Sequence, residues 1–246
     1  MRVKENTILW DECPICGGKE CEEILAGVLR CNGCRHEFRR MVPGKIKDVY
    51  YDRKYWENDK GRQGVHTIEP DDSWRGWVNS RIRTLDQFDL LSYAYPEDIS
   101  VFEVGCSEGM LLYALKERGF SVMGEDICAV ADESITSLGI RIDRRAIEEI
   151  DDMDDRFDII MSFHVVEHLR NPVEVFKNLR KMLKTGGKLL MQVPINEKEY
   201  LNADHFHFFS EESGERLMKV ATDRVDVKYS NYNRDWKQGT YVGQKL

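Results

Sequence analysis

The sequence has little that would tie it to a membrane or to nucleic acid. No stretch approaches the roughly 20 apolar residues that a membrane-spanning helix requires, and Met1-Arg-Val-Lys-Glu has no apolar signal region behind it. The formal net charge of −8 argues against broad attraction to nucleic acid, although a local basic face would be compatible with it. Internal repeats and low-complexity segments are also missing. We therefore expect a cytoplasmic protein with no membrane contact.

Cysteine is scarce outside one pattern. Four of the seven cysteines form Cys13-Pro-Ile-Cys16 and Cys31-Asn-Gly-Cys34, two C-x-x-C knuckles separated by fourteen residues. Each knuckle turns tightly enough for two thiolates to reach one ion, so the four sulfurs predict a tetrahedral zinc ribbon with no open coordination position. Such zinc would be structural. Two disulfides or four free thiols are the alternatives, and the absence of a secretory signal favours zinc over both.

The charge of this ribbon bears on its role. Residues 1–45 hold eight Lys or Arg and seven Asp or Glu, a formal charge of +1, and a zinc ion with four thiolates adds −2. Elements that bind nucleic acid are usually strongly basic. A packing or substrate-covering role is therefore favoured over nucleic-acid binding.

The glycine-containing turn at residues 105–109 lacks a glycine at position 107, and this indicates which ligand the turn would bind. Residues 99–110, Ile-Ser-Val-Phe-Glu-Val-Gly-Cys-Ser-Glu-Gly-Met, predict a strand, a turn and the start of a helix, an arrangement that directs backbone N–H groups at anions. The chain offers only Gly105 and Gly109, and Ser107 stands where the dinucleotide pattern G-x-G-x-x-G has its middle glycine. S-adenosylmethionine (SAM) fits better than a pyrophosphate. It has an ammonium that Glu103 could hold and a carboxylate for backbone amides.

These residues resemble a known family. Glu103-Val-Gly105-Cys-Ser-Glu-Gly109 is similar to the first motif of the Rossmann-like (class I) SAM-dependent methyltransferases. Gly124-Glu-Asp126-Ile, twenty-one residues beyond Gly105, resembles the end of their second strand, whose acid holds the ribose hydroxyls. Residues 157–169 resemble the fourth strand with its active-site exit, and residues 183–194 the turn into the fifth. The resemblance covers roughly residues 75 to 246.

The resemblance implies an α/β fold, a Rossmann-like seven-stranded methyltransferase sheet with helices on both faces. The chain would divide into the zinc ribbon at 1–45, a linker and helical cap over the cofactor pocket at 46–95, and the methyltransferase core at 96–246. The cofactor contacts that it implies are Glu103, Gly105, Cys106, Gly109, Asp126, Ile127, Ala146, Ile147 and Phe163. Relatives often carry an acid near Ala146 that touches the adenine amine, which this chain lacks.

Several elements follow from local patterns. Asn171-Pro172 predicts the start of a helix that Gly186-Gly187 would end. A last helix is expected at about 210–220, before a hairpin of residues 225–232 and 236–242 that distinguishes methyltransferases from nucleotide-binding dehydrogenases.

The segment before the core leaves two questions open. Tyr50-Tyr51-Asp-Arg-Lys-Tyr55-Trp56 resembles a segment that closes over the cofactor in many such methyltransferases, but these aromatics could equally seal the ribbon against the core. A helix is expected from Ser73 to about Tyr93. Its Arg75, Arg81 and Arg83 could clamp a diphosphate, although a solvated charged face is favoured.

Three polar residues follow the predicted fourth strand: His164, Glu167 and His168. Ligands of open α/β sheets bind outside the carboxyl ends of the strands. Methyl transfer is an in-line displacement that requires removal of a proton from the acceptor, and a near-neutral histidine suits that role. We expect His168 to be the general base and Glu167 to orient it. The pair resembles the catalytic pair of the zinc-bearing sugar methyltransferases.

A second histidine cluster, His205 and His207, is expected to face the same pocket, with His205 as a further catalytic residue. Glu167, His168 and His205 or His207 could instead bind a divalent ion. A similar pattern occurs in the metal-dependent methyltransferases that modify the terminal ribose of small RNAs. One base histidine, with the others capping turns or packing, is the simpler interpretation.

Together these features predict a SAM-dependent methyltransferase with structural zinc that O-methylates a small hydroxylated metabolite, a sugar or nucleotide sugar above all. An RNA ribose 2′-O-methyltransferase is the first alternative, and a basic stripe between ribbon and pocket would favour it. A noncatalytic SAM-binding or interaction module is the second. The presence of Glu103, Gly105, Asp126 and His168 counts against that module.

Overall fold

The structure is a computed structural model that describes residues 2–4, 7–44, 72–127, 137–197, 204–231 and 237–246. The aromatic segment expected at 50–56 lies outside these residues. Among the helices that are described, none is long and apolar enough to cross a membrane.

The core is a seven-stranded sheet in the order β13-β14-β11-β10-β7-β8-β9. Its strands are β7 (Ser100–Val104), β8 (Ser121–Glu125), β9 (Arg141–Asp143), β10 (Phe157–Phe163), β11 (Leu183–Ile195), β13 (Arg224–Asn231) and β14 (Lys237–Gln244). Strands β7 to β11 are parallel, whereas β14 runs antiparallel between β11 and β13. The predicted methyltransferase sheet and its final hairpin are thereby confirmed.

The strand order has a direct consequence for ligands. The chain starts in the middle of the sheet at β7, continues outward through β8 and β9, and returns to the other side of β7 with β10. At such a switch point the loops leave β7 and β10 in opposite directions and open a crevice at their carboxyl ends. Both strands are almost fully buried, as is typical of parallel strands covered on both faces.

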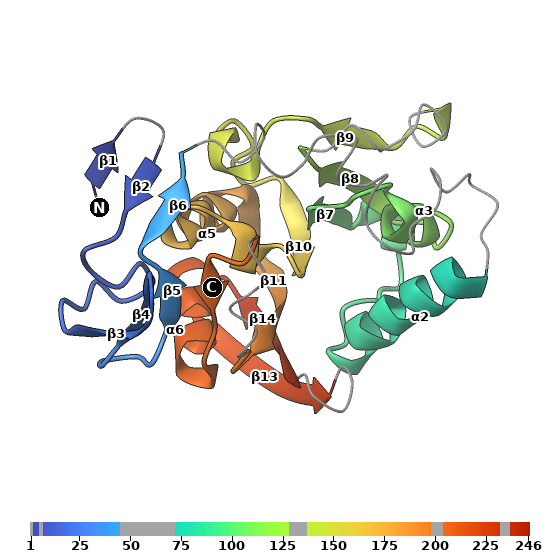
Figure 1. Cartoon of the computed structure of the whole chain (residues 1–246). Helices are drawn as coiled ribbons and strands as arrows, with labels where there is room; N and C mark the ends of the chain where they lie inside the picture. The colour runs from blue at the N-terminus through green and yellow to red at the C-terminus, as the bar shows by residue number, and fades with distance from the viewer. Residues whose placement is uncertain (1, 5–6, 45–71, 128–136, 198–203, 232–236) are drawn as a thin grey trace.

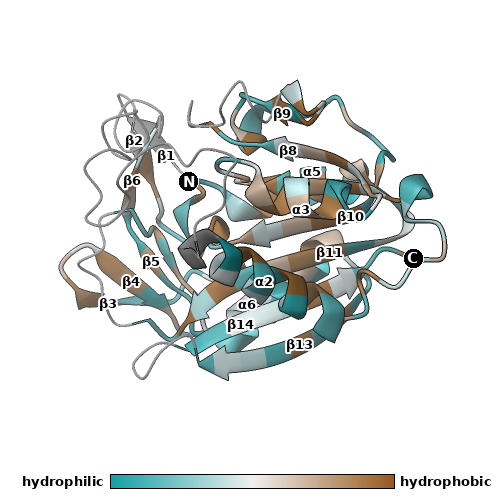
Figure 2. Ribbon diagram, turned by 90° about the vertical axis from the view of Figure 1, so that its right-hand side faces the viewer, coloured by the Kyte–Doolittle hydropathy of each residue, from teal (hydrophilic) through white to brown (hydrophobic). Residues whose placement is uncertain are grey.

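Helices cover both faces of the sheet (Figure 1). Figure 2, seen from one side, has α2 (Asp72–Gln87) and α3 (Met110–Lys116) in front of the strands. The opposite face carries α5 (Pro172–Met182) and α6 (Glu211–Ala221), which pack against each other. Short 3-10 turns complete the core: η1 (Pro96–Asp98), η2 (Ile147–Glu149) and η3 (Val166–His168).

Helix α5 begins as predicted but ends earlier. The Asn171 side chain accepts a hydrogen bond from the Glu174 N–H, and Pro172 occupies the first turn. The expected end at Gly186-Gly187 is wrong, because the helix ends at Met182 and β11 begins at Leu183, opposite Phe157 of β10. Pairing of Leu183 with β10 ends the helix before the chain reaches the two glycines, which lie at a register shift within β11. The helix expected at 73–93 likewise ends early, at Gln87.

The N-terminal ribbon consists of two small sheets. The first joins β1 (Arg2–Lys4), β2 (Thr7–Leu9) and β6 (Met41–Pro43), and the second has the order β12-β5-β4-β3, with β3 (Cys21–Leu25), β4 (Val28–Cys31), β5 (Glu37–Arg39) and β12 (His207–Phe208). Strand β12 belongs to the core segment of the chain, and it pairs His207 with Phe38. The ribbon therefore shares a sheet with the loop that precedes α6.

Candidate active site

The first half of the site is the carboxylate at the end of β7. Glu103 is only 1% exposed, and one of its oxygens, Oε1, lies 3.4 Å from the Arg81 guanidinium. The other oxygen, Oε2, is buried and has no hydrogen-bond partner in the described part of the chain. Burial raises the pKa of Glu103 to about 8, although Arg81 opposes this shift. A buried carboxylate oxygen of this kind fits the ammonium of SAM.

Glycine is required at the turn that follows. Gly105 has φ of 68°, and a Cβ there would lie 2.3 Å from Cγ2 of Val165. Acids of β8 and its exit hold the turn in place: the Ser107 N–H donates to Asp126 at 2.7 Å, and the Gly105 N–H lies 3.4 Å from a Glu125 oxygen. The spacing between Gly105 and Asp126 in the sequence thus corresponds to spatial proximity.

Arg81 departs from the expectation of a solvated helix face. Its side chain is 13% exposed, and its guanidinium carbon lies 3.5 Å from the Trp77 ring centroid and 4.6 Å from that of Phe163. Arg75, in contrast, is exposed as expected. The guanidinium faces the Glu103 carboxylate because α2 packs beside the carboxyl end of β7, an arrangement that the helix pattern alone did not indicate.

The remaining expected cofactor residues have different environments. Cys106 is buried and its N–H donates to the Glu125 carbonyl at 2.9 Å, while Gly109, with φ of 76°, precedes α3. Ile147 is buried in the core and Ala146 is the residue before η2. Ile127, the last described residue after β8, is partly buried and packs against that core.

The second half of the site lies at the carboxyl end of β10. One ligand-type atom each of Glu167, His168 and His205 lies within 4.8 Å of the others, and the two imidazole rings meet edge to face with centroids 4.7 Å apart. The backbone connects the two segments, because the Phe206 N–H donates to the Glu167 carbonyl at 2.8 Å. The structure therefore brings together the three residues that were predicted to be catalytic.

The electrostatics of this cluster differ from residue to residue. Burial disfavours the charge of Glu167, but the His164 hydrogen bond and the neighbouring histidines outweigh it and lower its pKa to about 2. Burial lowers the pKa of His168, which favours the neutral ring at pH 7. Burial acts in the same direction on His205, yet the hydrogen bond to Glu197 prevails and raises its pKa. Ionised Glu167 is thus next to His168, whose neutral form is favoured.

Each of the two histidines is oriented through Nδ1. Nδ1 of His168 lies 2.9 Å from the Asp204 carbonyl, and Nδ1 of His205 lies 2.7 Å from Oε2 of Glu197. Because a carbonyl or carboxylate can only accept, Nδ1 carries the proton in both rings, and in a neutral ring Nε2 then has the lone pair.

His164 adjoins the cluster in an unusual backbone conformation. It has φ of 56°, its N–H donates to the Gln192 carbonyl at 2.9 Å, and its Nδ1 lies 3.4 Å from Oε1 of Glu167. Non-glycine residues with positive φ are uncommon and often occur at functional sites.

His207 does not join the cluster, which corrects its inclusion among the candidate ligands. Its Nδ1 lies 3.0 Å from Nε2 of His36, and its Nε2 lies 2.9 Å from the Leu169 carbonyl. Both ring nitrogens are therefore engaged. Strand β12 begins only at His207, which pairs with Phe38 of β5, whereas His205 lies before the strand and is held by Glu197, so the two histidines have different environments.

Two residues of this region were missed by the sequence analysis. Glu197 is buried and holds His205, and its only signal was its position two residues beyond the end of β11. His36 is fully buried beside His207, and nothing in its local sequence indicated a contact with a residue so distant along the chain.

The four knuckle cysteines form a second cluster. Ligand atoms of Cys13, Cys16, Cys31 and Cys34 all lie within 4.8 Å of one another, with Sγ separations of 3.6 Å for Cys13 and Cys34 and 3.5 Å for Cys16 and Cys31. These distances are too long for disulfides, whose sulfurs are about 2 Å apart. They are compatible with tetrahedral zinc, where Zn–S bonds of about 2.3 Å separate the sulfurs by about 3.8 Å.

Known proteins share this architecture. The chain is 26% identical over 158 residues to the ubiquinone biosynthesis O-methyltransferase of Pseudomonas fluorescens, an alignment that covers 61% of this chain and 62% of that protein. The corresponding enzyme of Pseudomonas aeruginosa gives the same figures. The chain therefore spans less than two thirds of the length of these relatives.

Solved structures of methyltransferases have the same fold. Phosphoethanolamine N-methyltransferase 2 of Haemonchus contortus, in complex with SAM, matches with a TM-score of 0.62 and 14% identity over 85% of this chain and 62% of that one. A SAM-dependent methyltransferase of Archaeoglobus fulgidus matches with a TM-score of 0.56 and 16% identity over 70% and 94%.

A methyltransferase-domain family matches residues 75–221, more than half of the chain. This range contains the Glu103 turn, Asp126 and the Glu167–His168–His205 cluster. The protein belongs to the methyltransferase-domain family and has the class I, Rossmann-like fold of SAM-dependent methyltransferases.

Proposed function

We propose that the protein transfers the SAM methyl group to a hydroxyl of a small metabolite, with His168 as the general base. The observation that carries this proposal is the position of His168, a ring oriented by the Asp204 carbonyl beside buried Glu167, at the carboxyl end of β10. Donor and acceptor groups would meet there, because β10 adjoins β7 in the sheet.

Each half of the site has a separate task in this proposal. SAM, when bound, supplies the electrophilic methyl group. Glu103 holds its ammonium, and Asp126 is suited to the ribose hydroxyls. On the acceptor side, His168 takes the hydroxyl proton at Nε2 as the oxygen attacks, and Glu167 stabilises the resulting imidazolium. The site would also lower the activation barrier by holding the acceptor oxygen, the methyl carbon and the sulfur in line.

The acceptor is proposed to be a sugar or nucleotide sugar. The O-methyltransferase names of the Pseudomonas relatives support a hydroxyl acceptor, while the similarity to zinc-bearing sugar methyltransferases supports the sugar. Because those relatives are named for ubiquinone biosynthesis, phenolic compounds are compared with sugars as acceptors in the test.

The test is a screen of SAM-dependent methyl transfer to nucleotide sugars, dihydroxybenzoates and short RNAs, with His168→Ala beside the unchanged protein. Loss of the base should lower kcat by about 10² to 10⁴-fold, while SAM affinity by calorimetry changes less than twofold. Arg75→Ala, at an exposed helix position, is the matched control. Full turnover by His168→Ala would contradict the assignment of the base.

A divalent cation at Glu167, His168 and His205 is a second candidate for how the hydroxyl is activated. The specific observation in its favour is Oε2 of Glu167, which is buried without a hydrogen-bond partner in the described ranges. The carboxylate of Glu197 behind His205 is also typical of metal-binding histidines. Turnover that is abolished by a chelator and restored by Mg²⁺, Mn²⁺ or Zn²⁺ would favour this candidate over the base.

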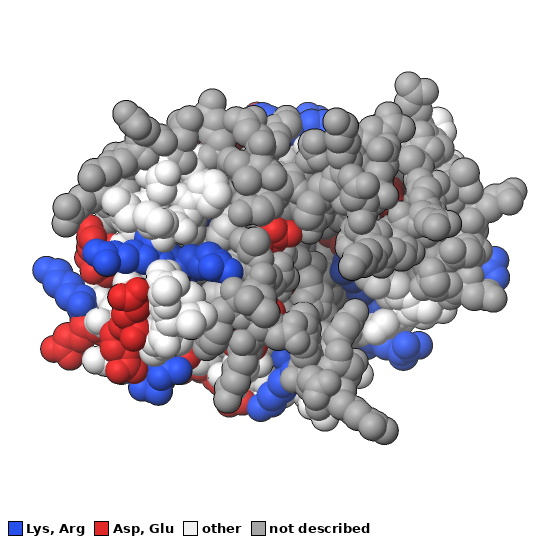
Figure 3. Space-filling view, in the orientation of Figure 1, with Lys and Arg blue, Asp and Glu red and all other residues white. Residues whose placement is uncertain are grey.

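RNA 2′-O-methylation receives less support. On the face drawn in Figure 3, acidic and basic side chains are interspersed over the N-terminal ribbon rather than forming a stripe of one sign. Ionic pairs such as Arg30 with Glu37 add to this balance. Nucleic-acid binding would require a net basic footprint, so the screen should give no transfer to RNA.

We further propose that the four knuckle cysteines hold one structural zinc ion, and that residues 1–45 form the zinc ribbon beside a core at 96–246. The burial of Cys13, Cys31 and Cys34 and the separations of all four sulfurs support this assignment. With four protein ligands the ion has no open position, so its contribution is to the fold of the ribbon rather than to the reaction.

A further inference from the structure

A cavity of about 380 Å³ lies between the ribbon and the active-site edge of the sheet. On the ribbon side it is lined by Arg30 of β4 and by Arg35, which follows the second knuckle. On the core side it is lined by Asn196 and Glu197, which follow β11. Because β10 and β11 are parallel, their carboxyl ends meet at the same edge.

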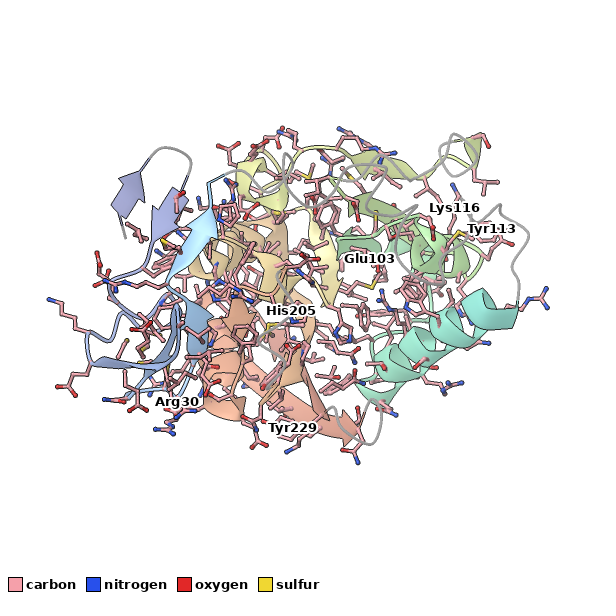
Figure 4. All side chains as sticks on the ribbon, in the orientation of Figure 1. Arg30, Glu103, Tyr113, Lys116, His205 and Tyr229 are labelled. Atoms are coloured by element: carbon pink, nitrogen blue, oxygen red, sulfur yellow. The ribbon has the colours of Figure 1, made fainter. Side chains whose placement is uncertain are left out.

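One side chain links this cavity to the candidate catalytic cluster. Glu197 lines the cavity, and its Oε2 lies 2.7 Å from Nδ1 of His205. In the view of Figure 4, His205 lies between Glu103 of β7 and Arg30 of the ribbon. The strand order agrees with this placement. Strand β10 lies between β7, which ends near Glu103, and β11, after which the cavity begins.

Among the described residues, the charges that line the cavity leave the Arg35 cation without a counterion. Arg30 pairs with Glu37 at 2.6 Å and with Glu22 at 3.4 Å, and Glu197 is paired with His205. Arg35 is exposed and has φ of 59°. Within the described ranges no carboxylate lies within 4.0 Å of its guanidinium. A guanidinium on the wall of a cavity is suited to bidentate binding of a phosphate or carboxylate.

A second polar atom of the cavity wall lacks a partner. Oε1 of Glu197 is buried and makes no hydrogen bond in the part of the chain that the structure describes. It can only accept, so it calls for a hydroxyl or N–H donor. Phe208 and Phe209 add apolar wall between the two polar groups.

We propose that this cavity is the acceptor subsite, and that it selects an acceptor with a compact anionic group, which Arg35 binds, and a hydroxyl donor for Glu197. The inference rests on the proposed O-methyltransferase function and narrows its substrate class to phosphorylated or carboxylated hydroxy compounds. The ribbon then has a role of its own, because it provides the selecting cation.

The volume agrees with an acceptor of this size. Small-molecule sites span about 300 to 1,000 Å³, so 380 Å³ suits a monosaccharide phosphate or a hydroxybenzoate. The position next to His205 would bring a hydroxyl of such a compound within the reach of the cluster.

Two probe pairs that differ in one anionic group test the proposal: glucose 1-phosphate against glucose, and 3,4-dihydroxybenzoate against catechol. Binding is measured by calorimetry on the full chain with saturating S-adenosylhomocysteine, so the result does not depend on turnover. Arg35→Gln removes the charge, Arg35→Lys restores it without the bidentate fork, and Arg40→Gln, an exposed ribbon arginine that does not line the cavity, is the matched control.

The anionic member of at least one pair should bind at least tenfold more tightly than its neutral partner. Arg35→Gln should reduce this preference about tenfold, Arg35→Lys should recover part of it, and Arg40→Gln should leave it within twofold. No preference in either pair, or a preference that Arg35→Gln leaves unchanged, overturns the proposal. Anion selectivity at Arg35 without methyl transfer to any compound would instead refute the proposed function and leave the subsite standing.

Discussion

Nε2 of His36 lies 3.0 Å from Nδ1 of His207, and this contact joins the ribbon to the loop of the candidate active site. Because the Leu169 carbonyl can only accept, Nε2 of His207 donates to it at 2.9 Å. Nδ1 of His207 must then accept from His36, whose own Nδ1 lies 3.2 Å from the Ser213 hydroxyl. Four segments of the chain are thereby held in one directed series of hydrogen bonds.

Replacement of His36 should loosen this connection. His36→Ala removes a fully buried ring and leaves Nδ1 of His207 without its donor, so we expect the free energy of unfolding to fall by about 2–3 kcal/mol. Denaturant titration measures this, and His36→Gln, which can still donate, should recover part of the loss. The proposal of a directed series would be wrong if both variants were as stable as the unchanged protein.

Glu103 should make SAM binding pH-dependent. Its pKa is raised to about 8, so at pH 7 the acid is largely protonated before binding, whereas the SAM ammonium requires the carboxylate. SAM affinity should therefore rise between pH 6 and 7.5, by up to about tenfold per pH unit, and binding should release a proton. Calorimetry in buffers of different ionisation enthalpy detects that proton.

The control for this prediction is Glu103→Gln. It should bind SAM at least about tenfold more weakly at pH 7.5, because it lacks the charge, and its affinity should be flat over the same pH range. An equally steep pH profile in the variant would assign the titration to another group.

Gly105 should tolerate no side chain. Gly105→Ala has to adopt φ of 68° and brings Cβ to 2.3 Å from Val165, so we expect a loss of about 2–4 kcal/mol in stability and weaker SAM binding. Gly27→Ala, with φ of 78° but nothing within 4 Å of its Cβ, should cost only about 1 kcal/mol. Thermal unfolding distinguishes the steric from the conformational cost, and equal losses would exclude the clash.

Metal analysis should find one zinc ion per chain, and Cys31→Ser should lose it. Cys31 is fully buried in the knuckle cluster, and structural zinc sites contribute directly to folding. We expect protease cleavage within residues 7–44 to become faster on zinc removal, while SAM binding by the core persists. A chain that is free of metal as purified and equally resistant to protease would contradict the zinc assignment.

Local patterns were sufficient for a large part of the fold. The Asn171-Pro172 start of α5, the helix α6 at about 210–220 and the final hairpin all follow from residues close together in the sequence. Segments whose conformation depends on strands distant in the sequence were less predictable. Gly186-Gly187 suggested a helix end, but the helix ends at Met182, and the two glycines lie at a register shift of β11 before its regular pairing with β10 and β14 begins at Lys188.

By itself, the sequence determined the cysteine knuckles, the glycine turn after Glu103 and the Glu167-His168 pair, because each depends on spacing within a few residues. Only the tertiary structure decided that His205 joins this pair while His207 faces His36, that Arg81 faces Glu103, and that Glu197 lies behind His205. These relationships arise when strands and helices distant along the chain become neighbours, and periodicity within one element carries no information about which neighbour it meets.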